Sequence, residues 1–180
     1  MSRSGIFATQ NLLTPHLQVY KGAHQNRPAQ NQEEGASYAL VMRLLEASKI
    51  FHHGHHLGID NYFTSPKLAL DLYEAHITCM GTVRKNRKGL PSSVKDASLR
   101  NKEVCERRKG NLLCAVYKDG SKQPILISTK ASAGFTKTTN SKGKQRRVPK
   151  IVQCYNKAMG GVDMSDAHLY KYLDECQTMK

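Results

Sequence analysis

Three aspartates stand where carboxylates could do chemistry together. Asp60 follows Leu57-Gly58-Ile59, a short apolar stretch that favours a strand, and open α/β sheets bind ligands at the carboxyl ends of strands. Asp163 and Asp166 are three residues apart, a spacing that places both on one face of a helix. Carboxylates from distant segments can hold two Mg²⁺ or Mn²⁺ ions for phosphoryl transfer. Taken singly, each also fits an ordinary role, as a loop residue or as a helix-dipole partner.

Positive charge is concentrated in one part of the chain. The 180 residues carry 28 Lys and Arg against 14 Asp and Glu, a net charge of +14. Residues 81–150 hold 19 of these cations and 4 of the acids, which leaves +15 there and −1 elsewhere. Such a chain prefers anionic partners, and a solvated basic surface is the alternative. The candidate DNA-contacting residues are Arg84, Lys85, Arg87, Lys88, Arg107, Arg108, Lys109, Lys142, Lys144, Arg146 and Arg147.

Other patterns exclude several classes of protein. No run of about 18 apolar residues exists, so we expect no membrane helix and no membrane partner. The five cysteines form no C-x-x-C pair, which favours reduced thiols over a disulfide or zinc framework. The histidines of the run 52–56 have no Cys or carboxylate at zinc spacing, so we interpret that run as a loop. Aromatic residues are few in the basic segment, with Tyr117 and Phe135 the candidates, so single-strand stacking there has little support.

Alternating helical and extended patterns predict an α/β layer. We expect strands at 16–20, 57–60 and 77–83 and helices at 37–50 and from Thr64-Ser65-Pro66 onward, with Leu68, Ala69, Leu72 and Tyr73 on the buried face of the second helix. Residues 84–110 read as a basic loop, 112–117 and 125–128 as two strands, and 129–150 as a mobile basic loop. Helical patterns return at 151–158 and 162–176.

Three collinear motifs give the chain a family resemblance. The stretch GHHLGIDNYFTSPKLALDLYEAHITCMGTVRKNRKGLP (54–91) resembles piggyBac-type transposases in its strand ending in Asp, its Asn-aromatic-Phe-Thr-Ser run and its Gly-Thr-Val-Arg strand. The stretch RRKGNLLCAVYKDGSKQPILIST (107–129) is similar to the segment that follows in that family. The stretch VQCYNKAMGGVDMSDAHL (152–169) is similar to its Tyr-Asn…Gly-Gly-Val-Asp…Asp block.

The resemblance implies an RNase H-like α/β core with a small β-containing insertion. Residues 1–84 would form the N-terminal part of the core, 85–148 the basic insertion that grips DNA, and 149–180 the C-terminal helices. Asp60 and Asp163 match the second and third catalytic acidic positions, and Asp166 matches a further carboxylate, so these three would be the metal ligands for Mg²⁺ or Mn²⁺.

The first acidic position is where the sequence departs from the family pattern. Counting twelve residues back from the Tyr of Val19-Tyr20-Lys21-Gly22 gives Ala8, and no Asp or Glu precedes Glu33. We expect the first core strand to be incomplete, because the chain starts at Met1. A two-metal site that lacks its central carboxylate should bind metal poorly and lose several orders of magnitude in rate. We therefore predict a piggyBac-derived DNA-binding protein that does not catalyse transposition, with Asp60 and Asp163 as vestigial residues.

Two alternatives remain beside this prediction. The chain could work as an active or partly active transposase, with the missing carboxylate supplied by Asp166 or by another molecule, or it could be a non-functional relic of a transposon. The expected partner is double-stranded DNA, contacted through its backbone, with a second copy or an intact transposase as the protein partner. We expect a nuclear location, for which the run 142–147 is a candidate import signal.

Overall fold

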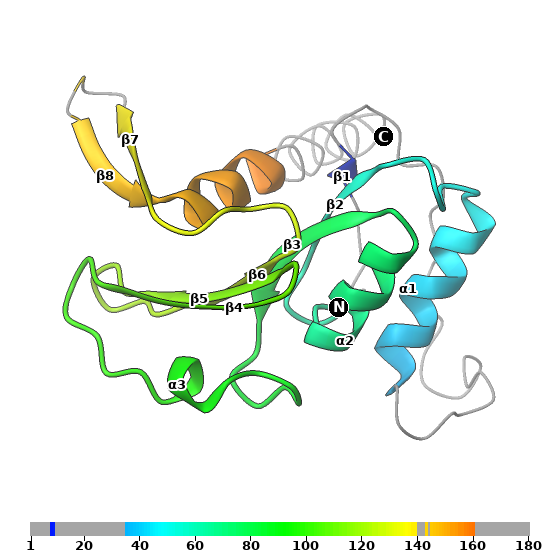
Figure 1. Ribbon diagram of the computed structural model, residues 1–180, viewed down its shortest axis with the longest axis horizontal. Coiled ribbons are helices and arrows are strands. Elements are labelled where there is room, and N and C mark those ends of the chain that lie inside the picture. The colour runs from blue at the N-terminus through cyan, green and yellow to red at the C-terminus, as the bar shows by residue number, and fades with distance from the viewer. Residues whose placement is uncertain (1–7, 10–34, 140–142, 144, 161–180) are drawn as a thin grey trace, which may run out of the picture.

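A six-stranded sheet organises the computed structural model (Figure 1), which describes residues 8–9, 35–139, 143 and 145–160. The strand order is β1-β2-β3-β6-β5-β4, and β7 and β8 form a separate hairpin. The strands are β1 (Ala8–Thr9), β2 (His56–Ile59), β3 (Thr78–Val83), β4 (Val104–Lys109), β5 (Leu112–Tyr117), β6 (Ile125–Ser128), β7 (Phe135–Thr139) and β8 (Gln145–Pro149). The helices are α1 (Gly35–Ala47), α2 (Pro66–Glu74) and α3 (Ser92–Lys95), and residues 150–160 form a further helix.

The main sheet is mixed. Strands β2 and β3 are parallel, with Ile59 paired to Gly81, whereas β1 with β2, β3 with β6, β6 with β5 and β5 with β4 are antiparallel. The parallel pair is joined through α2, as a parallel connection requires. The expected α/β class is confirmed. Because β3 pairs directly with β6, one continuous sheet joins the predicted core to the predicted insertion. The predicted boundaries of the insertion, at residues 84 and 148, stay a prediction.

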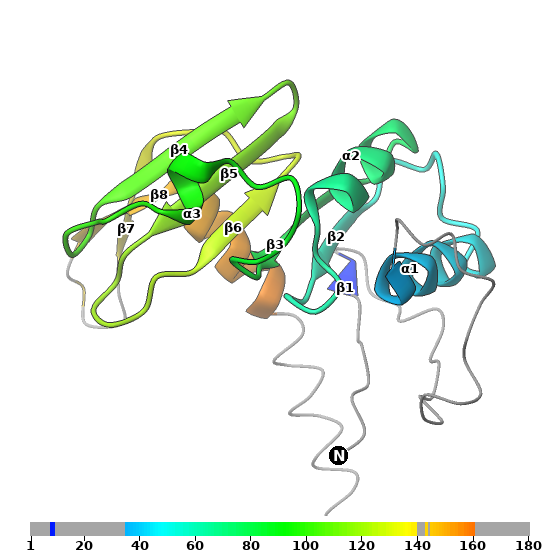
Figure 2. The same ribbon diagram turned by 90° about the horizontal axis from the view of Figure 1, so that it is seen from below.

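Both faces of the sheet are covered. On one face, Val41 and Leu45 of α1 and Leu68 and Leu72 of α2 join a buried cluster with side chains of β2, β3, β5 and β6. On the other face, Ile151 packs with inward residues of β5 and β6. In Figure 2, α1 and α2 lie beside β1, β2 and β3, and the orange helix of residues 150–160 passes behind β6. Burial on both faces explains why β5 reads as the continuous apolar run LLCAVY.

Most predicted elements are confirmed. Helices appear within a few residues of the predicted starts at 37 and 64, Ser65 caps α2, and strands occupy the predicted places at 57–60, 77–83, 112–117 and 125–128. The helical pattern at 151–158 is likewise confirmed. The predicted strand 16–20 and the last helix lie outside the described residues.

Three expectations are wrong. Residues 84–110 are not all loop, because they contain α3 and β4. Residues 129–150 are not one mobile loop, because β7 and β8 pair from Phe135↔Pro149 to Thr139↔Gln145. Tyr73 is not on the buried face of α2, since its side chain is exposed and Leu68, Ala69 and Leu72 form that face. In the described part of the chain, no helix is long and apolar enough to cross a membrane.

Candidate nucleic-acid interface and acidic site

Asp60 lies where buried strand β2 meets solvent. All four residues of β2 are buried, and Asp60, the next residue, is exposed. Its carbonyl oxygen accepts hydrogen bonds from the backbone N–H groups of Phe63 and Thr64, each at 3.0 Å. Its carboxylate accepts a longer bond of 3.4 Å from the N–H of Tyr62. The backbone therefore turns sharply after Asp60 and leaves the carboxylate on the solvent side of the strand end.

A close approach between two strands fixes this turn. The buried Thr64 hydroxyl lies 3.0 Å from the carbonyl oxygen of Ile59 and 2.8 Å from that of Asp60, and it donates toward both. Gly81 of β3 stands against the same atoms: a Cβ there would lie 2.2 Å from the Ile59 oxygen and 2.5 Å from the Thr64 hydroxyl. Only glycine fits that space, so the Gly-Thr-Val sequence of β3 positions the Asp60 turn.

Two arginines contact Tyr62, the second residue after Asp60. The Arg84 guanidinium lies 5.3 Å from the centroid of the Tyr62 ring, a cation–π distance. Arg87 Nη2 donates a hydrogen bond to the Tyr62 carbonyl oxygen. The first predicted basic run therefore lies against the acidic turn, although the two are about 25 residues apart in sequence.

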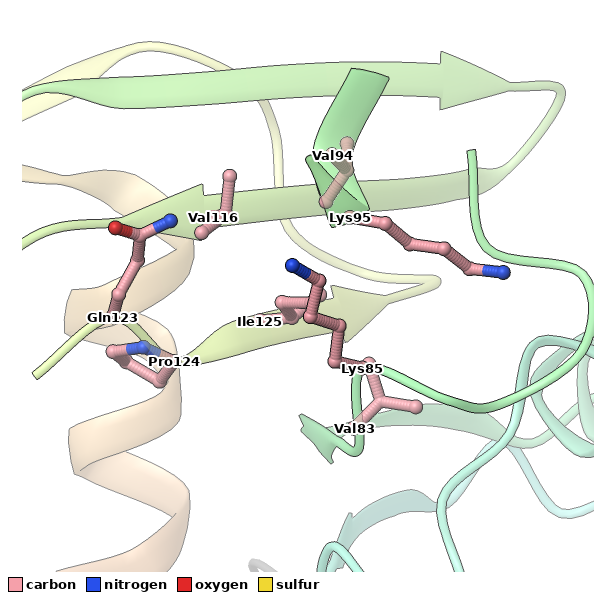
Figure 3. Close-up of a pocket in the computed structure, with 8 residues that line it drawn as sticks. All are labelled: Val83, Lys85, Val94, Lys95, Val116, Gln123, Pro124 and Ile125. Atoms are coloured by element: carbon pink, nitrogen blue, oxygen red, sulfur yellow. The ribbon is translucent and has the colours of Figure 1, made fainter. Parts of the chain in front are cut away.

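A shallow pocket lies at the same edge of the sheet (Figure 3). Its volume is about 260 Å³, below the range typical of small-molecule sites. Its buried lining residues are apolar, and Lys85 and Lys95 add cationic side chains to the lining. In Figure 3 the Lys85 ammonium lies among the other lining residues, and the Lys95 side chain runs away from them. Lys85 Nζ is 3.8 Å from Asp96 Oδ1, a distance at which an exposed pair contributes little. The lining residues are Val83, Lys85, Val94, Lys95, Val116, Gln123, Pro124 and Ile125.

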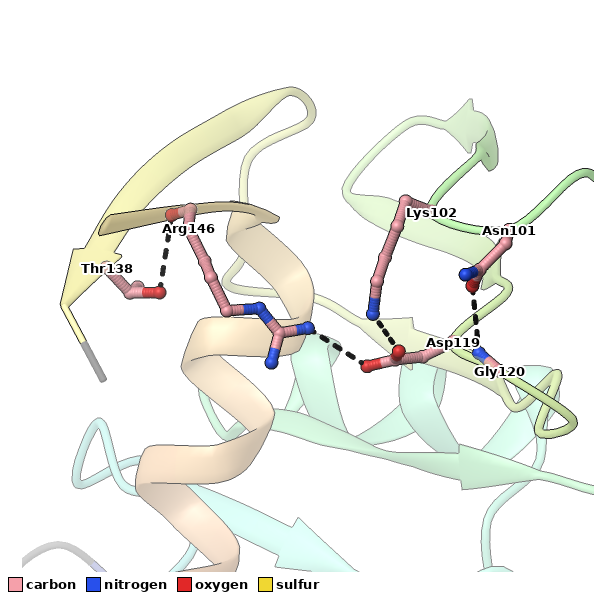
Figure 4. A network of polar contacts seen from close by, with 6 residues as sticks. All are labelled: Asn101, Lys102, Asp119, Gly120, Thr138 and Arg146. Atoms are coloured by element: carbon pink, nitrogen blue, oxygen red, sulfur yellow. Dashed lines mark hydrogen bonds and ion pairs between the residues drawn. The ribbon is translucent and has the colours of Figure 1, made fainter. Parts of the chain in front are cut away.

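Asp119 joins three segments beyond this pocket (Figure 4). Lys102 Nζ donates to Asp119 Oδ1, and Arg146 Nη2 of β8 lies 3.3 Å from Asp119 Oδ2. The Lys102 hydrogen bond, assisted by the charges of Lys102 and Arg146, holds the pKa of Asp119 below its usual range. Asn101 Oδ1 accepts from the N–H of Gly120 at 2.9 Å. Arg146 is thus engaged with an acid of the β5–β6 turn, and this contact ties the hairpin to the main sheet.

The predicted cations do not form one patch. The start of β4 pairs with the end of β5 at Val104↔Tyr117, on the edge where β2 ends, and Lys109↔Leu112 lies at the opposite edge. We call the side of the sheet where β2 and β3 end, next to Asp60 and Val83, the Asp60 edge. The run Arg107–Lys109 lies at the opposite side of the sheet. Arg108 Nη2 donates to the carbonyl oxygen of Ala131 at 2.6 Å. Arg147 lies 4.3 Å from the Phe135 ring centroid. Lys88 is exposed, and Lys142 and Lys144 lie outside the described residues.

Strand β1 and the helix of residues 150–160 both meet β2 at Gly58. Ala8 of β1 pairs with Gly58, two residues before Asp60. A Cβ on Gly58 would lie 3.7 Å from Ala158 Cβ and Met159 Sδ, so the helix of residues 150–160 reaches β2 at this point. Asp163 and Asp166 themselves lie outside the described residues. Within the described part of the chain, no three His, Cys, Asp or Glu side chains gather as metal ligands, so those residues alone do not fit Mg²⁺.

The described cysteines include two that are unsuited to act as nucleophiles. Burial raises the pKa of the Cys79 thiol to about 12 and that of Cys114 to about 11, the latter with a contribution from Cys105. Both thiols stay protonated near neutrality, and a thiolate is the reactive form. Thiol chemistry at these two residues therefore has no support.

Sequence reasoning missed several residues that shape this edge. It placed Tyr62, Thr64 and Gly81 in motifs without a role at the site, and it gave no role to Lys95 or Lys102. The one available signal was position, since Tyr62 and Thr64 follow Asp60 directly and Gly81 opens the Gly-Thr-Val-Arg motif. Of the two candidate stacking residues, Tyr117 is 3% exposed and Phe135 is covered in part by Arg147.

Comparisons with known proteins place this geometry in a family. A family model described as Transposase IS4 matches residues 5–180, nearly the whole chain. A structure of a piggyBac transposase synaptic complex with hairpin DNA superposes with a TM-score of 0.65 and 26% identity, covering 84% of this chain and 30% of that one. The chain belongs to the piggyBac-type transposase family.

Curated relatives agree with this membership. Human PiggyBac transposable element-derived protein 3 is 30% identical over 172 residues, covering 87% of this piggyBac-type chain and 28% of the relative. The human Chimeric ERCC6-PGBD3 protein shows the same identity over the same length, which is 16% of that protein. The chain therefore spans less than a third of the length of these relatives.

Proposed function

We propose that this chain is the DNA-binding part of a piggyBac-type transposase domain, that it contacts the backbone of duplex DNA, and that it does not cleave DNA by itself. The observation that carries the proposal is the set of cations along the Asp60 edge. Arg84 and Arg87 contact Tyr62 in the turn after Asp60, and Lys85 and Lys95 line the adjacent pocket. Cations that neutralise phosphates supply sequence-independent affinity.

The core that carries this edge is proposed to be RNase H-like. The support is the convergence at Gly58 of β1, of the strand that ends at Asp60, and of the helix that leads toward Asp163. In the sequence, Asp163 is the fourth residue after Met159, and Asp166 is the seventh. Asp163 and Asp166 lie outside the described residues, so their place in this core is part of the proposal.

The absence of independent cleavage rests on the acidic positions. Ala8 stands at the counted first position, opposite Gly58, and alanine offers no ligand. Mg²⁺ or Mn²⁺ would supply charge stabilisation for phosphoryl transfer in a complete site. Of the three carboxylates expected as metal ligands, Asp60 is the one that belongs to the described residues, so no metal-dependent step is assigned to this chain alone.

A second candidate function is participation in an active assembly with another copy or an intact transposase. The observation that favours it is the tight fit around Asp60, where Gly81 and Thr64 hold the turn as a functional acidic residue would require. Two clusters of buried apolar side chains cover the two faces of the sheet, and this packing favours either candidate over a marginally folded relic of a transposon. A nuclear location, with residues 142–147 as import signal, belongs to both candidates.

Binding to a random-sequence duplex of about 30 base pairs tests the first proposal. The logarithm of the affinity should fall linearly with the logarithm of salt concentration between about 50 and 200 mM. Lys85→Ala and Lys95→Ala should each weaken binding and reduce the slope by about one. Arg43→Ala removes the same charge from an exposed position on α1 and should leave the slope unchanged. Weak binding without salt dependence, or equal losses in all three variants, would refute the proposed surface.

Cleavage is tested separately. The chain is incubated with a hairpin-ended duplex in Mg²⁺ or Mn²⁺, and products are resolved on denaturing gels. No nicking is expected from the chain alone. Metal-dependent nicking that Asp60→Asn abolishes would instead show that the chain completes its own site.

A further inference from the structure

An aromatic side chain is held at the surface directly beside Asp60. Tyr62 is 40% exposed, and it is one of three exposed large hydrophobic side chains among the described residues. Two hydrogen bonds hold the Tyr62 backbone: its N–H donates to the Asp60 carboxylate, and its carbonyl oxygen accepts from Arg87. The centroid of the Phe63 ring lies 5.0 Å from that of the Tyr62 ring, and the two ring planes meet at 84°. The ring is therefore positioned by its neighbours and still presented to solvent.

The groups around this ring match the parts of a nucleotide. The Arg84 guanidinium, 5.3 Å from the ring centroid, belongs to an exposed side chain with the reach to bind a phosphate. An aromatic ring beside a cation is the combination that binds single-stranded nucleic acid, because every base has a face that can stack. In an intact duplex that face is covered by neighbouring base pairs, so a protein ring can stack only on a base that is unpaired or extruded.

We propose that Tyr62 is a stacking platform for one unpaired DNA base at the Asp60 edge. The base occupies the ring, and Arg84 moves from the ring to the adjoining phosphate. This places a flexible or unpaired position of the DNA, rather than a regular duplex step, next to the Asp60 carboxylate. The inference rests on the proposed DNA binding and deepens it by naming the DNA feature that the acidic edge selects.

Other aromatic residues of the described chain fit this role less well. Tyr117 is buried, and Phe135 is half-buried under Arg147. Tyr73 is 38% exposed, close to the value for Tyr62, but stands on α2 beside Glu74. Its similar exposure makes Tyr73 the matched control.

The experiment compares three duplexes of one sequence with the full chain: fully paired, with one unpaired 2-aminopurine nucleotide, and with an abasic nucleotide at that place. The unpaired base should bind about 5- to 150-fold tighter than the paired duplex, the factor expected from one stacked base. Tyr62→Ala should remove that gain and leave paired-duplex affinity unchanged. Tyr62→Phe and Tyr73→Ala should keep it, and stacking should quench 2-aminopurine fluorescence in each chain that keeps the gain.

The outcomes separate the two proposals. Equal affinity for the abasic and base-containing duplexes would overturn the inference, because it would assign the gain to DNA flexibility. A gain that survives Tyr62→Ala would overturn it as well, as would paired-duplex binding with no gain in the wild-type chain, and both leave the proposed function standing. Absence of binding to all three duplexes would overturn both proposals. Arg84→Ala should lower the salt slope by about one for the unpaired-base duplex.

Discussion

The turn that carries Asp60 depends on a residue without a side chain. Replacing Gly81 with Ala would place a Cβ 2.2 Å from a backbone oxygen that strand pairing holds in place. Since backbone atoms cannot rotate away, we expect a loss of about 3 kcal/mol in the free energy of unfolding, the upper end of overpacking costs. Urea denaturation of the two proteins measures this difference in the free energy of unfolding.

Gly58→Ala is the control for this prediction. A Cβ at Gly58 would lie 3.7 Å from Ala158 Cβ and Met159 Sδ and 4.0 Å from the Ala158 carbonyl oxygen, all ordinary contact distances. Its cost should be clearly smaller than that of Gly81→Ala. Equal losses would show that glycine at 81 serves general strand flexibility and not the close approach to Ile59 and Thr64.

His56 gives the fold a dependence on pH. Its ring is buried at the start of β2, with Nδ1 3.0 Å from the Thr78 hydroxyl oxygen. Burial, and then the charge of Lys130, lowers the pKa of His56 from its ordinary value of 6.5. The folded chain therefore binds this proton less readily than the unfolded chain, and stability is lost as pH falls below about 6.5 toward the folded pKa.

Thermal unfolding between pH 7.5 and 5 tests this dependence. The melting temperature of the wild-type chain should fall with pH, and that of His56→Asn should fall less steeply. His53→Asn, at an exposed position in the same segment, should retain the wild-type slope. If His53→Asn flattens the curve as much as His56→Asn does, burial is not the cause.

At the scale of elements, α2 shows how a local signal sets an element boundary. The Ser65 hydroxyl oxygen accepts a 3.2 Å hydrogen bond from the N–H of Leu68, and Pro66 occupies the first turn, where its missing N–H costs nothing. Ser65→Ala should cost about 0.5–2 kcal/mol of unfolding free energy, measured by denaturant titration. Ser92→Ala is the control, because α3 has Pro91 at its cap and no side-chain cap bond. Equal effects would contradict a specific role for the cap.

The elements that the sequence did not predict share one physical cause. Strands β4, β7 and β8 are rich in Lys, Arg and Thr and have few buried side chains, so they lack the apolar alternation that identifies a strand. Pairing with a neighbouring strand decides these elements: β4 pairs with buried β5, and β7 pairs with β8. Where apolar burial lies within the segment, as in β5, the prediction was correct.

At the scale of the whole molecule, the helix of residues 150–160 links the two halves of the sheet. Ile151 packs with Leu113, Ala115 and Leu126 on strands β5 and β6, and the far end of the helix reaches Gly58 on β2. Ile151→Ala should therefore cost about 2–5 kcal/mol while unfolding remains one cooperative transition. Asn156→Ala, at an exposed position of the same helix, should change stability little. Two separate transitions would show that the outer strands fold as an independent unit.

The sequence by itself determined the α/β class, the charge of the basic segment, the strand that ends at Asp60 and, through its motifs, the piggyBac-type family. These are properties of local pattern and of residue order. The tertiary structure alone decided that Arg84 and Arg87 contact the Asp60 turn, that the run Arg107–Lys109 faces the opposite edge, and that Gly81 makes room for Ile59 and Thr64. The reason is that strand register and pairing bring together residues far apart in the chain, and no local pattern encodes which strands become neighbours.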